Sequence, residues 1–389
     1  MNETQEKTIF LDNASTTQMY KEVSEIISKT NLENFYNPSA MYHKSVVVKD
    51  SIENAKSYIA QMLNVDPKSI IFTSGATEAN NLAIMGSLTA KKGAEYIFSS
   101  GEHPSVYNVA KTLEQKGNIV HFVKLGNDGS VDLEHLKSLL NENTHFVSIM
   151  FVSNETGAIN DIKTISSIIK SFNPKIIFHV DGVQAFCKIP CNLTKLGVDA
   201  FTISAHKFHG PKGVGLLYYK NLNQLKPQIL GGGQQLGFRS GTENVSGILG
   251  MAKAVQLEQE NIAQNYENVK SFKQIFIDQI KNDLNGYNYH INGSFENSSP
   301  YILSVSFKEL RGEVLMHILE QKGVIVGTGS ACSSKKQENR VLANMGQTLD
   351  YVKGNIRVSF SSTNTLEEII LASKILTESV KELYESMSR

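Results

Sequence analysis

The sequence of 389 residues contains only three cysteines, Cys187, Cys191 and Cys332. Three cysteines form no evident disulfide framework, and they fall short of the four thiolates that hold a conventional iron–sulfur cluster. The cysteines and histidines also lack the tight pairs and four converging ligands that a zinc site requires. We therefore expect a protein that binds no metal and that resides in a reducing compartment, the cytoplasm.

An excess of charge and a long apolar segment are absent as well. Lysine plus arginine and aspartate plus glutamate both number 38, so the formal net charge is zero. A chain without net charge is not expected to bind nucleic acid or an anionic membrane directly. No uninterrupted apolar run is long enough to cross a bilayer, and residues 1–7 have no apolar core. We therefore expect neither a membrane span nor a signal peptide.

Short apolar runs alternate with helical patterns through the first two thirds of the chain. This alternation predicts an α/β fold with a mostly parallel sheet and helices on both faces. A long, polar-rich helical pattern over Ser246–Leu284 is expected to link this large part to a smaller C-terminal one. The smaller part is predicted to hold a strand at Ile302–Phe307, a helix at Glu313–Gln321 and a last helix from Glu367 onward. Within the larger part the predicted strands are Ile70–Thr73, Tyr96–Ser99, Val120–Val123, Phe146–Phe151, Ile176–Val180, Phe201–Ser204 and Val214–Tyr218, and the predicted helices are Asn80–Ala90, Val106–Gln115, Leu133–Leu140 and Ile162–Ser171.

The most informative polar residues follow two of these predicted strands. One apolar run is followed by Asp181 and, three residues on, Gln184, and another ends at Ser204 just before His206 and Lys207. Polar groups at the carboxyl ends of neighbouring strands meet in an α/β fold. This set suits pyridoxal phosphate, which needs a lysine for a Schiff base and a carboxylate that keeps its pyridine nitrogen protonated. Taken singly, such an aspartate is more often a helix cap and such a lysine a solvated surface residue.

Two further segments could contact the same cofactor. The segment Thr73–Asn81 follows a strand and opens a helix, where backbone N–H groups, the Thr77 hydroxyl and the helix dipole would favour a phosphate. An ordinary capped helix would show the same pattern. His103 ends another strand and could stack on the cofactor, although a histidine there is a simple loop residue about as often.

Cys332 differs from the other two cysteines in its surroundings. It lies among the small, polar residues Gly329–Ser334, and Lys335 and Lys336 follow and would favour the reactive thiolate. A thiolate on a mobile loop can attack a substrate atom and pass the product elsewhere. We therefore expect Ser330–Gln337 to be mobile. An incidental exposed cysteine is the alternative reading.

Ten short motifs, each different from the others, follow one another along almost the whole chain. They are Leu11–Thr17, Asn37–Ser39, Ser74–Asn81, Glu102-His103, Asn154–Gly157, Asp181–Gln184, Ser204–Gly213, Arg239–Asn244, Gly329–Ser334 and Ile356–Ser359. In this order the motifs resemble the cysteine desulfurases, a group within the class V aminotransferase branch of the fold-type I pyridoxal phosphate enzymes. The Ser-Ala-Cys-Ser-Ser stretch resembles the long-loop group, which serves iron–sulfur cluster assembly, nitrogenase maturation and tRNA thiolation.

The resemblance implies both an architecture and a reaction. A large pyridoxal phosphate-binding domain would span residues 18–260, and residues 1–17 and 261–389 would form a small domain with the Cys332 loop. The expected homodimer removes sulfur from L-cysteine, giving L-alanine and a persulfide on Cys332. That sulfur would pass to an acceptor protein, either a cluster scaffold or a tRNA-thiolating enzyme. Other class V enzymes share the cofactor turn, so an aminotransferase or a selenocysteine lyase is the alternative, and an inactive relative serving as a scaffold is a more distant one.

The resemblance also assigns roles residue by residue. Lys207 would carry the Schiff base, Cys332 the persulfide, and His103 would stack on the cofactor ring. Arg357 would bind the substrate carboxylate through two parallel hydrogen bonds. The implied substrate contacts are Asn13, Ala14, Asn154 and Arg357. The implied cofactor contacts are Ala76, Thr77, His103, Asn154, Asp181, Gln184, Ser204, His206, Lys207 and, from the partner subunit of the dimer, Thr242.

Overall fold

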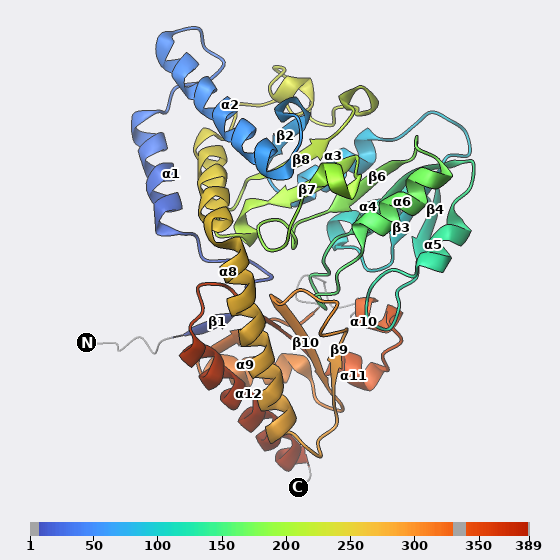
Figure 1. Ribbon diagram of the computed structural model, residues 1–389, viewed down its shortest axis with the longest axis vertical. Coiled ribbons are helices and arrows are strands. Elements are labelled where there is room, and N and C mark those ends of the chain that lie inside the picture. The colour runs from blue at the N-terminus through green and yellow to red at the C-terminus, as the bar shows by residue number, and fades with distance from the viewer. Residues whose placement is uncertain (1–7, 330–339, 388–389) are drawn as a thin grey trace.

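A seven-stranded sheet forms the centre of the larger part of the computed structural model, which describes residues 8–329 and 340–387 (Figure 1). Its strands are β2 (Ile70–Thr73), β3 (Glu95–Ser99), β4 (Ile119–Val123), β5 (Thr144–Met150), β6 (Ile177–Asp181), β7 (Ala200–Ser204) and β8 (Gly215–Tyr219). The strand order is β2-β8-β7-β6-β5-β3-β4, and within this sheet β8 alone runs against the others. The predicted α/β fold with a mostly parallel sheet is therefore confirmed.

Helices pack on both faces of this sheet. They are α1 (Lys21–Glu33), α2 (His43–Leu63), α3 (Ala76–Gly86), α4 (Pro104–Gln115), α5 (Leu133–Leu139), α6 (Ile162–Phe172), α7 (Leu193–Leu196) and α8 (Val245–Asp283). On β5, Phe146 packs in one apolar cluster with α3 and α4, whereas Val147 packs in another with α6 and α8. Successive side chains of a strand point to opposite faces, so both faces of the sheet are covered. Because helices cover both faces of the sheet, β6 and β7 are buried along their whole length.

Most predicted elements agree with the structure to within two residues at each end, but the prediction for α3 was wrong in register. The helix begins at Ala76 rather than Asn80 and ends at Gly86 rather than Ala90. Its first turn lacks an apolar stripe, so hydrophobic periodicity alone places the start too late. The end is fixed by a close approach, since the Gly86 carbonyl accepts a hydrogen bond of 2.8 Å from the Lys226 amide. Helices α1 and α2 are not among the predicted elements.

The smaller part combines the first described strand with the C-terminal third of the chain. A three-stranded antiparallel sheet has the order β12-β10-β9, and β1 pairs in parallel with β11. The strands are β1 (Ile9–Leu11), β9 (Tyr289–Asn292), β10 (Ile302–Phe307), β11 (Val324–Val326) and β12 (Asn355–Ser359). The helices are α9 (Gly312–Gln321), α10 (Arg340–Asn344), α11 (Leu349–Lys353) and α12 (Leu366–Met387).

The long helix α8 connects the two parts (Figure 1). Its first half contributes to the core beneath the large sheet, its second half contributes to the core of the smaller part, and Tyr266 packs against both. The predicted domain boundary near residue 260 falls within this helix, and the division itself stays a prediction. Of the helices in the described parts of the chain, none combines the length and apolarity that crossing a membrane requires.

Candidate active site

A cavity of about 580 Å³ opens at the carboxyl ends of the central strands, between the two parts of the molecule. It brings together polar residues that follow β2, β3, β5, β6 and β7, as expected for an α/β sheet. The smaller part contributes Thr328, Gly329, Arg340 and Arg357 to its wall. The predicted site residues that line the cavity are Ala14, Ala76, Thr77, His103, Asn154, Asp181, Gln184, Ser204, His206, Lys207 and Arg357.

Three predicted site residues are not placed in this cavity. Asn13 is buried, and its side-chain amide donates to the carbonyls of Phe10 and Ser359, which ties the first strand to β12. Thr242 is exposed on this single chain and does not line the cavity. Cys332 and the segment expected to be mobile lie outside the described residues. The roles predicted for Asn13, Thr242 and Cys332 therefore stay predictions.

Asp181 is the buried carboxylate at the end of β6. Its Oδ1 accepts a hydrogen bond of 3.1 Å from the Val183 amide, and its Oδ2 accepts one of 2.9 Å from the Asn80 side chain. The same Asn80 nitrogen lies 2.9 Å from the Ser105 hydroxyl, which lies 2.8 Å from Nδ1 of His103. Asn80 thus links the carboxylate to the histidine. Its role was not predicted, because an asparagine inside a helical pattern reads as polar surface.

His103 is both a cavity residue and the N-cap of α4. Its Nδ1 accepts a hydrogen bond of 3.2 Å from the Ser105 amide, as N-cap side chains do. Burial lowers the pKa of His103, although the nearby Asp181 charge acts in the opposite direction. The ring is therefore neutral at physiological pH, with its proton on Nε2. A neutral, fixed aromatic ring is suited to stacking on a flat ligand.

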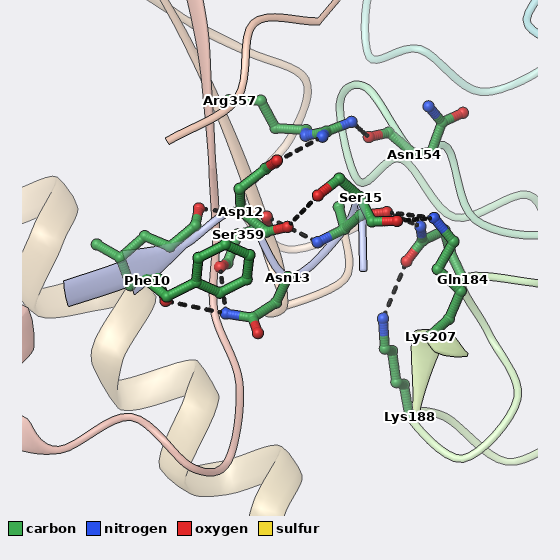
Figure 2. A network of polar contacts seen from close by, with 12 residues as sticks. Phe10, Asp12, Asn13, Ser15, Asn154, Gln184, Lys188, Lys207, Arg357 and Ser359 are labelled. Atoms are coloured by element: carbon green, nitrogen blue, oxygen red, sulfur yellow. Dashed lines mark hydrogen bonds and ion pairs between the residues drawn. The ribbon is translucent and has the colours of Figure 1, made fainter. Parts of the chain in front are cut away.

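The Lys207 amine meets the first loop of the chain (Figure 2). Its Nζ donates to the carbonyl of Ala14 at 2.8 Å and to that of Ser15 at 2.6 Å. The Gln184 side chain donates to the same Ala14 carbonyl at 2.8 Å. A second, buried lysine, Lys188, donates to Gln184 Oε1 at 2.9 Å. Two lysines and an amide therefore share one polar cluster, and Lys188 is a member that the sequence analysis did not single out.

The N-terminus of α3 forms one end of the cavity. Gly75 there has a φ of 152°, a conformation that side chains other than hydrogen disfavour, and it turns the chain directly from β2 into the helix. The cavity wall next to it contains Ala76, Thr77, Ser204 and His206. Burial lowers the pKa of His206 to about 4, with the charge of a neighbouring lysine acting in the same direction. Backbone N–H groups, two hydroxyls and a neutral imidazole are groups that can together hold a phosphate-type anion.

Arg357 extends from β12 toward the opposite end of the cavity (Figure 2). Its Nη1 donates to the Asn154 carbonyl at 3.0 Å, and its Nη2 forms an ion pair of 2.7 Å with Asp12. Its Nε is buried and has no hydrogen-bond partner among the residues that the structure describes. Two neighbours therefore fix the guanidinium in place. Asp12, which orients it, lies in a recognised motif but was not predicted as a site residue.

Another acid, the half-buried Glu155, lines the cavity beside two arginines, and its Oε2 atom is shielded from solvent. Burial raises the pKa of Glu155 to about 7, although the charges of Arg340 and Arg357 oppose that rise. Arg340 is itself anchored, since it donates to the carbonyls of Ser100 and Glu102 and lies 3.8 Å from the ring centroid of Tyr107.

Among the described residues, no cluster of three histidine, cysteine, aspartate or glutamate side chains could hold a metal ion.

A helix N-terminus that can hold an anion, a buried carboxylate and a half-buried amine at the edge of an α/β sheet are typical of a class of cofactor-dependent enzyme. The family model described as aminotransferase class-V matches residues 9–371. The chain belongs to this class V aminotransferase family, and within it to the cysteine desulfurases. The family, the fold and the enzyme class predicted from the motifs are thereby confirmed.

The relatives that support this placement cover nearly the whole chain. A cysteine desulfurase IscS of Dictyoglomus turgidum is 37% identical over 378 residues, which is 96% of this chain and 95% of the relative. A cysteine desulfurase IscS of Neisseria meningitidis is 35% identical over 383 residues, 97% of this chain and 93% of the relative. A solved NifS-like protein is 34% identical with a TM-score of 0.91, covering 96% of this chain and all of that one. A solved SspA in complex with cysteine is 29% identical with a TM-score of 0.80, covering 92% of this chain.

Proposed function

We propose that the cavity described above binds pyridoxal phosphate and L-cysteine, and that Cys332 accepts the substrate sulfur as a persulfide. The observation that carries this proposal is the composition of one cavity, which unites Asp181, Lys207 and Arg357. Thr328 and Gly329 also line this cavity, and the chain reaches Cys332 three residues later. The cysteine held by the SspA relative supports L-cysteine as the substrate.

The residues present fit the cofactor. The N-terminus of α3 with Thr77, Ser204 and His206 would hold its phosphate, Asp181 its pyridine nitrogen, and His103 one face of its ring. The bound cofactor would supply an electron sink that takes up the electron pair of the substrate α-carbon.

The side chains of this protein then have defined tasks. Lys207 would hold the cofactor through its amine, and the same amine is the base that would move the α-proton of the substrate. Asp181, oriented by Asn80, would hold the proton on the ring nitrogen. Arg357 would bind and orient the substrate carboxylate. The Cys332 thiolate bonds to the substrate sulfur as the carbon–sulfur bond breaks, and the carbon takes a proton to give L-alanine.

The product distinguishes this function from its alternatives. Purified protein supplied with pyridoxal phosphate, L-cysteine and a thiol reductant is expected to release L-alanine and sulfide in equal amounts. An aminotransferase would instead convert the amino acid into a keto acid and need an amino acceptor. A lyase restricted to selenocysteine would release alanine from selenocysteine and none from cysteine. The sulfur acceptor, a cluster scaffold or a tRNA-thiolating enzyme, and the cytoplasmic location stay predictions.

Replacing Arg357 by lysine tests carboxylate recognition. Lysine keeps the charge but loses the planar fork, so we expect the KM for L-cysteine to rise about 10- to 100-fold with a smaller change in kcat. Steady-state kinetics with L-cysteine measure both constants. Arg340→Lys is the matched control, because Arg340 lines the same cavity but is held by the Ser100 and Glu102 carbonyls. A larger KM effect for Arg340→Lys would reassign the substrate contact.

Replacing Asn80 by alanine tests the support of Asp181. The change removes the hydrogen bonds to Asp181 and Ser105, and we expect the affinity for pyridoxal phosphate to fall about 10-fold. Equilibrium dialysis of the cofactor measures that affinity. Asn81→Ala is the control, since the Asn81 side chain donates to the Thr77 carbonyl of the same helix in an exposed hydrogen bond. Equal losses in both variants would exclude a specific role for Asn80.

We also propose the homodimer, in which Thr242 of the partner would complete the phosphate site. Large apolar side chains are exposed in the connections of the larger part, with Met41 97% exposed and Leu230 79% exposed. Exposed apolar side chains that gather in one patch mark a protein–protein interface, and the proposed dimer would bury Met41 and Leu230 in this way. Analytical ultracentrifugation is expected to give twice the chain mass of 43.0 kDa. Met41→Glu combined with Leu230→Glu should lower that mass, whereas Leu371→Glu on α12 should leave it unchanged.

A further inference from the structure

Lys188 is a buried lysine with no role in the reaction described above, and Gln184 and the Ala14 carbonyl connect it to Lys207. Lys188 sits in the turn after β6 and is almost fully buried. Its Nζ donates to Gln184 Oε1 at 2.9 Å (Figure 2). The same Nζ lies 5.5 Å from the ring centroid of Tyr301. An ammonium group is costly to bury, so its presence here requires a compensating interaction.

The hydrogen bond from Lys188 decides which way the Gln184 amide faces. A carboxamide has an accepting oxygen and a donating nitrogen, and the two ends can exchange by rotation. A protonated amine has donors and no acceptor, so the Oε1 end of Gln184 must face Lys188 while Lys188 is charged. The Nε2 end then points the other way, where it donates to the Ala14 carbonyl, the same oxygen that accepts from Lys207.

Charged and titratable groups surround Lys188 from several elements. Burial lowers the pKa of Lys188 to about 7, with the charge of Lys207 acting in the same direction and that of Glu258 against it. The neutral amine still donates but can also accept, so the charged form is the one that fixes the orientation of the Gln184 amide. The groups that interact with it electrostatically are Lys207, Glu258, Cys187, Arg357, His206 and His209.

We propose that Lys188 is a positioning residue that fixes the Gln184 carboxamide with its nitrogen toward the cofactor side of the cavity. This inference rests on the proposed binding of pyridoxal phosphate, whose ring oxygen is the acceptor that the fixed amide would meet. Without Lys188 the amide can rotate and present its oxygen instead. An oxygen there would repel the ring oxygen, whereas the nitrogen stabilises its negative charge.

The experiment is a pH titration of the visible absorption band of the cofactor in the holoenzyme. Loss of a fixed donor and of a nearby positive charge both favour the protonated chromophore. We therefore expect Lys188→Met to raise the apparent pKa of the band by about one unit. Lys188→Arg, which keeps a charged donor, should restore most of the difference. Lys188→Leu, which is neutral and cannot donate, should give the same upward shift and replaces Lys188→Met if that variant does not fold.

A second pair of variants separates positioning from a direct charge effect. In a Gln184→Ala background there is no amide to orient, so Lys188→Met should shift the band by less than half as much as in the wild type. Equal shifts in the two backgrounds would overturn the proposal.

Lys273 provides a matched control. It is another buried lysine, its Nζ donates to the Ser298 hydroxyl at 2.7 Å, and it lies 5.8 Å from the ring centroid of Phe295. Lys273→Met removes a comparable buried charge far from Gln184 and should leave the titration unchanged. No shift in Lys188→Met beyond that of Lys273→Met would also overturn the proposal. If the wild-type protein gives no cofactor band at all, the proposed function fails instead, so the two failures are distinguishable.

Discussion

Replacement of Cys332 by alanine is expected to lower the rate of L-alanine formation from L-cysteine by at least about 10³-fold, since the nucleophile that receives the sulfur is removed. The cofactor should still bind, because the residues that line the described cavity are unchanged, and its visible band should persist. Incubation with isotopically labelled cysteine followed by mass spectrometry checks the prediction, with a persulfide on Cys332 in the wild type and none in the variant.

The other two cysteines are the natural controls. Cys187 and Cys191 are buried, and burial raises the pKa of both thiols, so neither is available as a thiolate near neutral pH. Cys187→Ala and Cys191→Ala should keep most of the activity. Sulfide released at the wild-type rate by Cys332→Ala would eliminate the persulfide route and favour a lyase.

Replacement of Lys207 by alanine is expected to lower activity by about 10⁴-fold or more and to remove the borohydride-sensitive absorption band. The amine that binds the cofactor covalently and the base that moves the α-proton are lost together. Absorption spectra before and after borohydride reduction, combined with an alanine assay, measure both effects.

Lys212→Ala is the matched control for this change, because Lys212 lines the same cavity. It should retain the band and much of the activity. Loss of the band in Lys212→Ala with its retention in Lys207→Ala would show that the wrong lysine has been assigned.

The chemistry at the strand ends could be predicted from the sequence because it is local. Asp181 and Lys207 each follow an apolar run directly, and parallel strands place such residues at one edge of a sheet. The first and last residues of such buried strands are clear from the apolar run, so the predicted bounds of β2 and β10 are the same as those in the structure.

The supporting residues could not be predicted, because their roles depend on contacts between distant segments. Asn80 reaches Asp181 across 101 residues, and Asp12 reaches Arg357 across 345. Lys188 lies four residues from Gln184, yet only the burial of that turn shows that the pair is shielded from water. The start of α3 was misjudged for a related reason, since its first turn is selected for contact with the cavity rather than for an apolar stripe.

The pairing of β1 with β11 has a consequence for how the protein is made and handled. Ile9 aligns with Val324, and the loop directly after this strand supplies the Ala14 and Ser15 carbonyls that meet Lys207. On the ribosome, β1 must therefore wait for most of the polypeptide to emerge before the strand that it pairs with exists. A purification tag joined at Met1 would precede Ala14 by 13 residues along the chain, so a carboxyl-terminal tag is the better choice for every assay described above.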